Sequence, residues 1–159
     1  MTTMFYRPPE PVFAALFALV DGLAGFVTVS RRWRHWADVP AELQPCLFQV
    51  EPPGQTVQYQ WRANGAPVIT AKAEFVVYCR EEDASQPISP LLNALIANIF
   101  AALEPPACES SGRLQLFDAN GNFVAYHARI NGEVNIIEGV TTDQAQGVAY
   151  IPVEILVSG

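Results

Sequence analysis

Charged side chains are scarce in this sequence. They make up 16% of its 159 residues, against the roughly 25% usual for globular domains, while hydrophobic residues make up 50%. Sixteen acidic residues outnumber nine basic ones, so the formal net charge is −7. Because proteins that grip nucleic-acid phosphates usually carry a basic excess, tight nucleic-acid binding is disfavoured. Two interpretations of the sparse charge stay open: an outer surface covered by other subunits, or a compact core under a polar, uncharged skin.

Long apolar runs are also missing. The hydrophobic stretch from Val12 to Val20 is far shorter than the roughly 20 residues that cross a membrane. Only one basic residue, Arg7, precedes it, and Glu10 is acidic, which is not the pattern of a signal peptide. We therefore expect no membrane contact, and a buried helix of a cytoplasmic protein at this position.

Residues able to carry catalysis are few and scattered. Cys46, Cys79 and Cys108 form no C-x-x-C pair, which argues against zinc and redox sites. No G-x-S-x-G, H-E-x-x-H or Walker pattern is present. A nucleophile pair of Cys79 with His127, in a small hydrolase, stays open, but a hydrogen-bonded strand histidine is favoured. We expect no catalytic residue, cofactor or metal site, and the acidic run at 81–83 is expected to be a solvated loop rather than a cation site.

Apolar spacing predicts two helices within a single domain, residues 1–159. The first carries an apolar stripe from Phe13 to Val20. The second begins with Ser89 as the expected N-cap and Pro90 at the first helical position, and it stops before Pro105.

The other segments rich in β-branched and aromatic residues predict strands, at 26–36, 46–51, on both sides of Asn64-Gly65, 113–118, 122–130, 133–139 and 148–157. The strand from Val68 to Arg80 is apolar enough to be central. Asn120-Gly121 and Asn131-Gly132 predict tight turns. Pro152 lacks an amide donor, so the last strand is expected at an edge or a bend. This order predicts an α+β two-layer sandwich, a mostly antiparallel or mixed sheet with two amphipathic helices on one face.

One basic patch stands out, in which arginines alternate with aromatic residues. It comprises Arg31, Arg32, Trp33, Arg34 and His35. Arginine and tryptophan are enriched where protein partners anchor, so the patch is a candidate interface. An exposed strand with solvated arginines and inward-packed tryptophans would explain it equally well. Nucleic-acid binding ranks behind both because the whole chain is acidic.

The order of elements, with the phrases "PAELQPCLFQV" and "EGVTTDQAQGVAYIPVEI", resembles the tail terminator proteins of long-tailed bacteriophages, also called tail-completion or minor tail protein U-like proteins. The resemblance spans nearly the whole chain and includes no catalytic signature. It implies a two-layer domain that assembles into a ring, usually six-fold, on the head-proximal end of the tail tube. The ring ends tube polymerisation and offers a docking surface to head-completion proteins. Another phage neck or tail joining protein is the alternative, ahead of a small hydrolase.

The same resemblance implies the partners. They are further copies of the chain, the tail tube protein and the head-completion or connector protein, with DNA passing through the lumen without specific binding. The location would be the virion tail or neck, after assembly in the cytoplasm of the host bacterium. We expect the final strand to complete the sheet and the loop ahead of it, 141–147, to lie at one rim of the ring. Its candidate contact residues are Thr141, Thr142, Asp143, Gln144 and Gln146.

Overall fold

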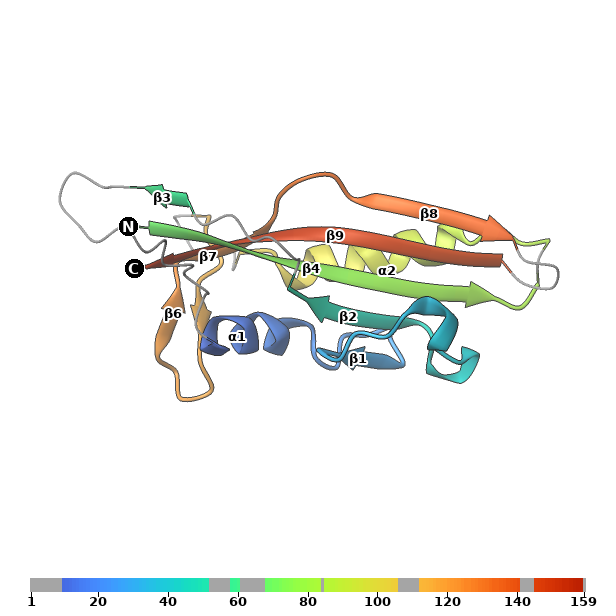
Figure 1. Cartoon of the computed structure of the whole chain (residues 1–159), viewed down its shortest axis with the longest axis horizontal. Coiled ribbons are helices and arrows are strands. Elements are labelled where there is room, and N and C mark those ends of the chain that lie inside the picture. Colours follow the sequence, from blue (N-terminus) through green and yellow to red (C-terminus); the bar gives the residue numbers. More distant parts are fainter. Residues whose placement is uncertain are drawn as a thin grey trace, which may run out of the picture.

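Two strands of 14 residues each, β4 (Val68–Glu81) and β9 (Ala145–Ser158), pair antiparallel along their whole length. The computed structural model describes residues 10–51, 58–60, 68–83, 85–105, 112–140 and 145–158. In it, β4 and β9 form the centre of a seven-stranded sheet (Figure 1). The prediction of a long central strand from Val68 is confirmed.

Five shorter strands flank this central pair in the order β1-β2-β4-β9-β7, while β3 also pairs with β4 and β8 with β9. Only β1 and β2 are parallel, so the sheet is mixed. The five are β1 (Thr28–Ser30), β2 (Cys46–Val50), β3 (Gln58–Gln60), β7 (His127–Ile130) and β8 (Asn135–Val140). A separate two-stranded hairpin joins β5 (Leu116–Phe117) to β6 (Phe123–Ala125) across the predicted Asn120-Gly121 turn.

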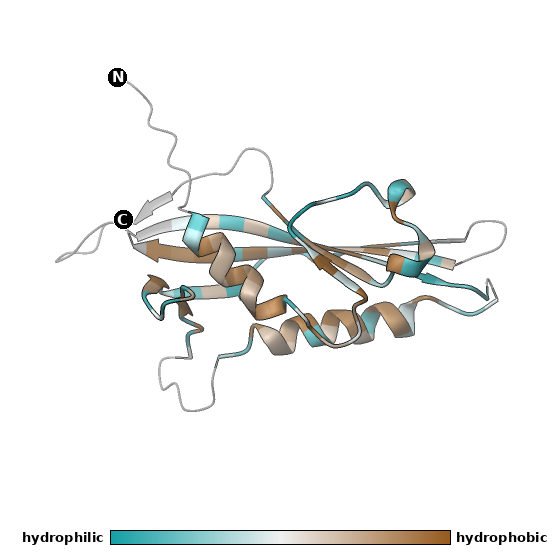
Figure 2. Ribbon diagram, turned by 90° about the horizontal axis from the view of Figure 1, so that it is seen from below, coloured by the Kyte–Doolittle hydropathy of each residue, from teal (hydrophilic) through white to brown (hydrophobic). Residues whose placement is uncertain are grey.

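Two helices, α1 (Glu10–Val20) and α2 (Ser89–Ala102), cover one face of the sheet (Figure 2). Their apolar sides, including Phe13 and Ile99, pack with Phe75 and Ile151 of the central strands in one buried cluster. The predicted α+β two-layer fold, with both helices on one face, is confirmed. Within the described residues, neither helix has the length and apolarity to cross a membrane.

The other face of the sheet, which we call the open face, has a thinner cover. Short 3-10 turns at Trp36–Asp38 and Ala41–Leu43 lie over one end of it. There a second buried cluster forms from Val39, Cys46, Phe48, Val76 and Tyr78. Val148 and Tyr150 of β9 pack against this cluster but are only half-buried. The open face is therefore capped at the β2 side and progressively barer towards β8.

Several details of the predicted elements are wrong, beginning with one strand and one helix cap. The strand expected at 26–36 is limited to β1, because the chain leaves the sheet after Ser30 and turns into the 3-10 segment at Trp36. Ser89 is not the N-cap of α2: that position is Ile88, and Ser89 is the first helical residue. The Ser89 hydroxyl instead donates to Glu138 Oε1 at 2.6 Å, which ties the start of α2 to β8.

Pro152 lies in the sheet interior and not at an edge. Strands β7 and β8 follow one another along the same side of β9, and the break between them, residues 131–134, lies opposite Pro152. The Asn131 amide donates to the Pro152 carbonyl at 3.1 Å, so the missing proline N–H also faces this side. Asn131-Gly132 is thus a break in one interrupted strand, and no hairpin forms there. The N–H that Pro152 lacks would point to this break, where no neighbouring strand needs it as a hydrogen-bond donor.

The break between β7 and β8 requires a glycine at position 132. Its φ is +126°, and a Cβ built on it would lie 2.9 Å from Pro152 Cγ. Gly132→Ala should therefore lower the free energy of unfolding by about 2 kcal/mol, measured by urea denaturation. Gly139→Ala, where a Cβ meets nothing within 4 Å, is the control and should change it by less than about 0.5 kcal/mol. Equal effects of the two variants would refute the role given to the break.

Candidate assembly surface

The basic segment, which we define as Arg31–His35, runs out of β1 and lies exposed apart from half-buried Arg31. The side chain of Trp33 is 49% exposed and that of nearby Trp36 is 42% exposed. The explanation with inward-packed tryptophans is therefore wrong. The segment is nonetheless ordered, because the Trp33 indole N–H donates to the Tyr78 hydroxyl at 3.1 Å and His35 contacts both indole rings. Burial raises the pKa of Tyr78 to about 12, so this hydroxyl stays protonated.

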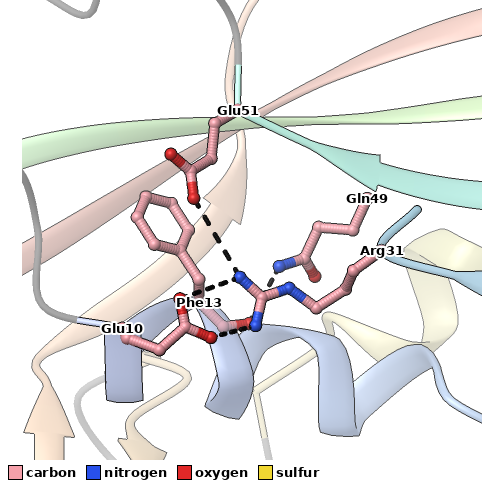
Figure 3. A network of polar contacts seen from close by, with 5 residues as sticks. All are labelled: Glu10, Phe13, Arg31, Gln49 and Glu51. Carbon is pink, nitrogen blue, oxygen red and sulfur yellow. Dashed lines mark hydrogen bonds and ion pairs between the residues drawn. The ribbon is translucent and has the colours of Figure 1, made fainter. Parts of the chain in front are cut away.

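Arg31 differs from the rest of the segment because its charge is used inside the molecule (Figure 3). Its guanidinium makes a bidentate ion pair with Glu10 at the start of α1, and one nitrogen lies 4.0 Å from Glu51 after β2. Beside it, the Gln49 amide donates to the Phe13 carbonyl at 2.8 Å. The hydrogen bond with Glu10 raises the pKa of Arg31. Arg31 thus fastens α1 to the sheet, and Arg32 and Arg34 remain as exposed charges.

This division of roles can be measured. Arg31→Ala should lower the free energy of unfolding by about 1 kcal/mol at low salt, because a bidentate ion pair joining two elements is lost. Arg32→Ala, at an exposed position one residue further on, should leave it unchanged within about 0.5 kcal/mol. Chemical denaturation at low and high salt measures both, and the Arg31 effect should shrink with salt. If Arg32→Ala destabilises as much as Arg31→Ala, the assignment is wrong.

The second predicted interface, residues 141–147, is only partly within the described residues. Thr141, Thr142, Asp143 and Gln144 lie outside them. Gln146 belongs to β9 and pairs with Arg80 on one side and Gly139 on the other, so the expectation of a loop at 145–147 is wrong. These residues continue the long central pairing instead. Gln146 lines a crevice with Trp36 and Val148, which places it beside the end of the basic segment on the open face.

Two further features escaped the sequence analysis. Every residue of β8 from Asn135 to Gly139 is exposed, including Ile136 at 46% and Ile137 at 59%. On the open face near β1, a hollow of about 240 Å³ is lined by apolar residues and two arginines. Its lining comprises Thr28, Ser30, Arg32, Arg34, Val39, Leu43 and Phe48. The adjacent isoleucines in "NIIEG" were the available signal for the first feature, whereas the hollow follows only from the tertiary structure.

Cys79 and His127 do not form a catalytic pair. Cys79 pairs with Gly147 of β9, and His127 pairs with Leu156 of the same strand. Gly147 and Leu156 are nine residues apart, about 30 Å at the usual strand rise, and this odd spacing places the two side chains on opposite faces of the sheet. His127 Nδ1 accepts a hydrogen bond from the Leu114 amide at 3.0 Å, so the favoured interpretation, a hydrogen-bonded strand histidine, is confirmed. Burial, with help from Arg129, lowers the pKa of His127. The hydrolase hypothesis therefore loses its proposed residues.

The described part of the chain also offers no metal centre. Among those residues, no group of three or more His, Cys, Asp or Glu side chains could hold an ion. In the acidic run, Glu82 and Asp83 are exposed, and Asp83 accepts hydrogen bonds from the Ser85 amide and hydroxyl. This is the geometry of a solvated turn, as predicted for these two residues, whereas Glu81 is the last residue of β4 and pairs with Ala145.

The buried cysteines should be chemically inert. Burial raises the pKa of Cys46 to about 12 and that of Cys79 to about 11, so neither thiol ionises near neutral pH. In a Cys108→Ser protein at pH 8, we expect a disulfide reagent to react with these two thiols at least about 100-fold more slowly in the folded state than in urea. Fast reaction of one thiol in the folded protein would revive the case for a nucleophile.

Comparisons with known proteins bear on the fold. No family model and no curated protein matches this chain. A protein chain in the virion of a native gene transfer agent particle has a similar structure, with a TM-score of 0.55 at 13% sequence identity, covering 97% of this chain and 99% of that one. A second solved chain, 9% identical over 91% of this chain and 90% of its own, reaches a TM-score of only 0.44 and supports no argument. The first match establishes a shared fold over the full length.

Proposed function

We propose that this chain is a structural component of a phage-like virion, and within it the tail terminator that caps the head-proximal end of the tail tube. The observation that carries the proposal is the end-to-end structural similarity to a chain of a gene transfer agent virion. The resemblance of the element order and closing phrases to tail terminators supports the finer assignment independently. A ring of copies on the tube would end polymerisation and present the docking surface for head-completion proteins.

The physical character of the chain suits such a part. Cys46 and Cys79 are buried and His127 accepts a hydrogen bond from the Leu114 amide, whereas isoleucines of β8 and the arginines and tryptophans that follow β1 are exposed. Arginine and aromatic anchors are what protein interfaces use. Six copies of a chain with net charge −7 would carry −42 formal charges, which would keep passing DNA from adhering to the lumen.

Thr141–Gln144, together with Gln146, are proposed to contact the tube or the neighbouring subunit. Thr141, Thr142, Asp143 and Gln144 follow β8 and precede β9 in the sequence, and Gln146 belongs to β9. Replacing these four residues leaves every residue of the β8–β9 pairing unchanged.

The proposal is tested by adding the purified protein to its polymerising tail tube protein and imaging the products by electron microscopy. Tubes should acquire a ring with a central hole at one end and stop lengthening. A variant with Thr141–Gln144 replaced by a Gly/Ser linker of equal length should fold, by circular dichroism, and fail to cap. Tubes of unaltered length without end density would contradict the terminator role. A ring that binds head-completion protein but ignores tubes would point to a joining protein instead.

A further inference from the structure

The two edges of the sheet are unlike each other and lie on opposite sides of the molecule. β8 forms one long edge and β1 the other (Figure 1). Four strand spacings, about 19 Å, separate them, so they cannot touch within one copy. Within the described residues, no strand pairs with the outer side of either one. Each edge therefore presents free backbone donors and acceptors.

The β8 edge combines apolar and acidic side chains. Ile137 pairs with Val148, whose neighbours belong to the open-face cluster, so Ile137 lies on the open face. It is 59% exposed at a position where an edge strand usually carries a charge. Glu133, four residues earlier, is exposed at the break opposite Pro152. This edge has the composition of a strand that a partner covers.

The β1 edge carries the complementary chemistry on the same face. Thr28 and Ser30 face the hollow, whose floor includes Phe48 and whose lining includes Arg32 and Arg34. The floor is apolar enough to receive an aliphatic side chain, and the arginines can pair with a carboxylate beside it. The hollow and Ile137 both lie on the open face. If the sheet of one copy continues into the sheet of the next, Ile137 of one copy can therefore meet the hollow of the other.

We propose that the β8 edge of one copy docks antiparallel against the β1 edge of the next, with Ile137 in the hollow and Glu133 beside Arg32 and Arg34. This inference rests on the proposed ring and deepens it, because it names the surfaces by which copies join. The contact is heterologous, since different edges meet, and such a contact gives a ring when its repeated rotation closes. A face-to-face contact of identical edges would instead stop at a dimer.

The strand directions support this arrangement. β1 runs parallel to β2, and each step from β2 through β4 and β9 to β8 reverses direction, so β8 is antiparallel to β1. A neighbouring copy in the same orientation therefore offers an antiparallel strand. If Ile137 lies beside Ser30, the chain before β8 runs back towards Glu133 on the side where the chain after Ser30 runs on to Arg32 and Arg34. One antiparallel orientation thus serves both the apolar and the ionic requirement.

Disulfide trapping tests the contact. Two proteins are made in a Cys108→Ser background, one with Ser30→Cys and one with Ile137→Cys, and they are mixed at high concentration under mild oxidation. We expect a covalent dimer in the mixture at least about ten-fold above that of either protein alone. Glu104→Cys, at an exposed position after α2, replaces Ile137→Cys as the matched control and should give no dimer with Ser30→Cys. Absence of the mixed dimer at any concentration would overturn the inference.

A charge exchange then tests the ionic part. Glu133→Arg and Arg34→Glu should each raise the dissociation constant of self-association by roughly five-fold at low salt, and the double variant should recover most of the affinity. Sedimentation measures the association and circular dichroism verifies the fold. Recovery in the double variant supports a direct pairing, whereas additive weakening contradicts it. The controls are Arg129 and Glu154, which pair within one copy at 2.8 Å, so exchanging them should leave self-association unchanged.

The two proposals fail in different ways. If electron microscopy shows rings but the Ser30→Cys and Ile137→Cys proteins do not cross-link, the ring stands and this pair of edges is wrong. If cross-linking succeeds while tubes are never capped, the edge contact stands and the terminator role is wrong. If neither rings nor cross-links form, both are wrong.

Discussion

The pairing of β4 with β9 is the constraint on which the rest of the structure depends. Fourteen consecutive residue pairs fix which side chains face the helices and which face the open side. A slip by one residue would turn Phe75 and Ile151 away from α1 and α2 and expose them. Because every other strand of the large sheet except β1 pairs with one of these two, the edges are also placed by this register.

The same constraint explains the irregular side of the sheet. β9 must be central to bury its apolar face, yet it contains Pro152, which cannot donate to a neighbour. The chain resolves this by interrupting the neighbouring strand at Gly132, so that β7 and β8 pair with β9 on either side of the proline. The interruption also places Glu133 outside the ladder and ends the sheet in β8, whose residues from Asn135 to Gly139 are exposed in the single copy.

How far the sequence predicts this protein depends on whether a feature is local. Helix α2 and strand β4 were predictable because apolar period and flanking prolines are properties of neighbouring residues. The early end of β1 was not, since the residues after Ser30 make contacts distant in the sequence, such as that of Arg31 with Glu10, 21 positions away. The composition of the sequence revealed the basic segment. It could not show that Arg31 is used in an internal ion pair while Arg32 and Arg34 remain exposed. Nor could the exposure of Ile137, because a strand becomes an edge only through its partners.

The internal use of Arg31 makes its neighbours more effective as a surface. A partner that immobilises a long side chain or a loose segment loses part of its binding energy to conformational entropy. Here Arg31 holds the start of the basic segment against α1, and the Trp33–Tyr78 hydrogen bond holds its middle against β4. Arg32 and Arg34 are therefore carried on a backbone that folding has already fixed. Arg31 is the arginine least available to a partner, yet by holding the backbone it lowers the entropy cost of binding through Arg32 and Arg34.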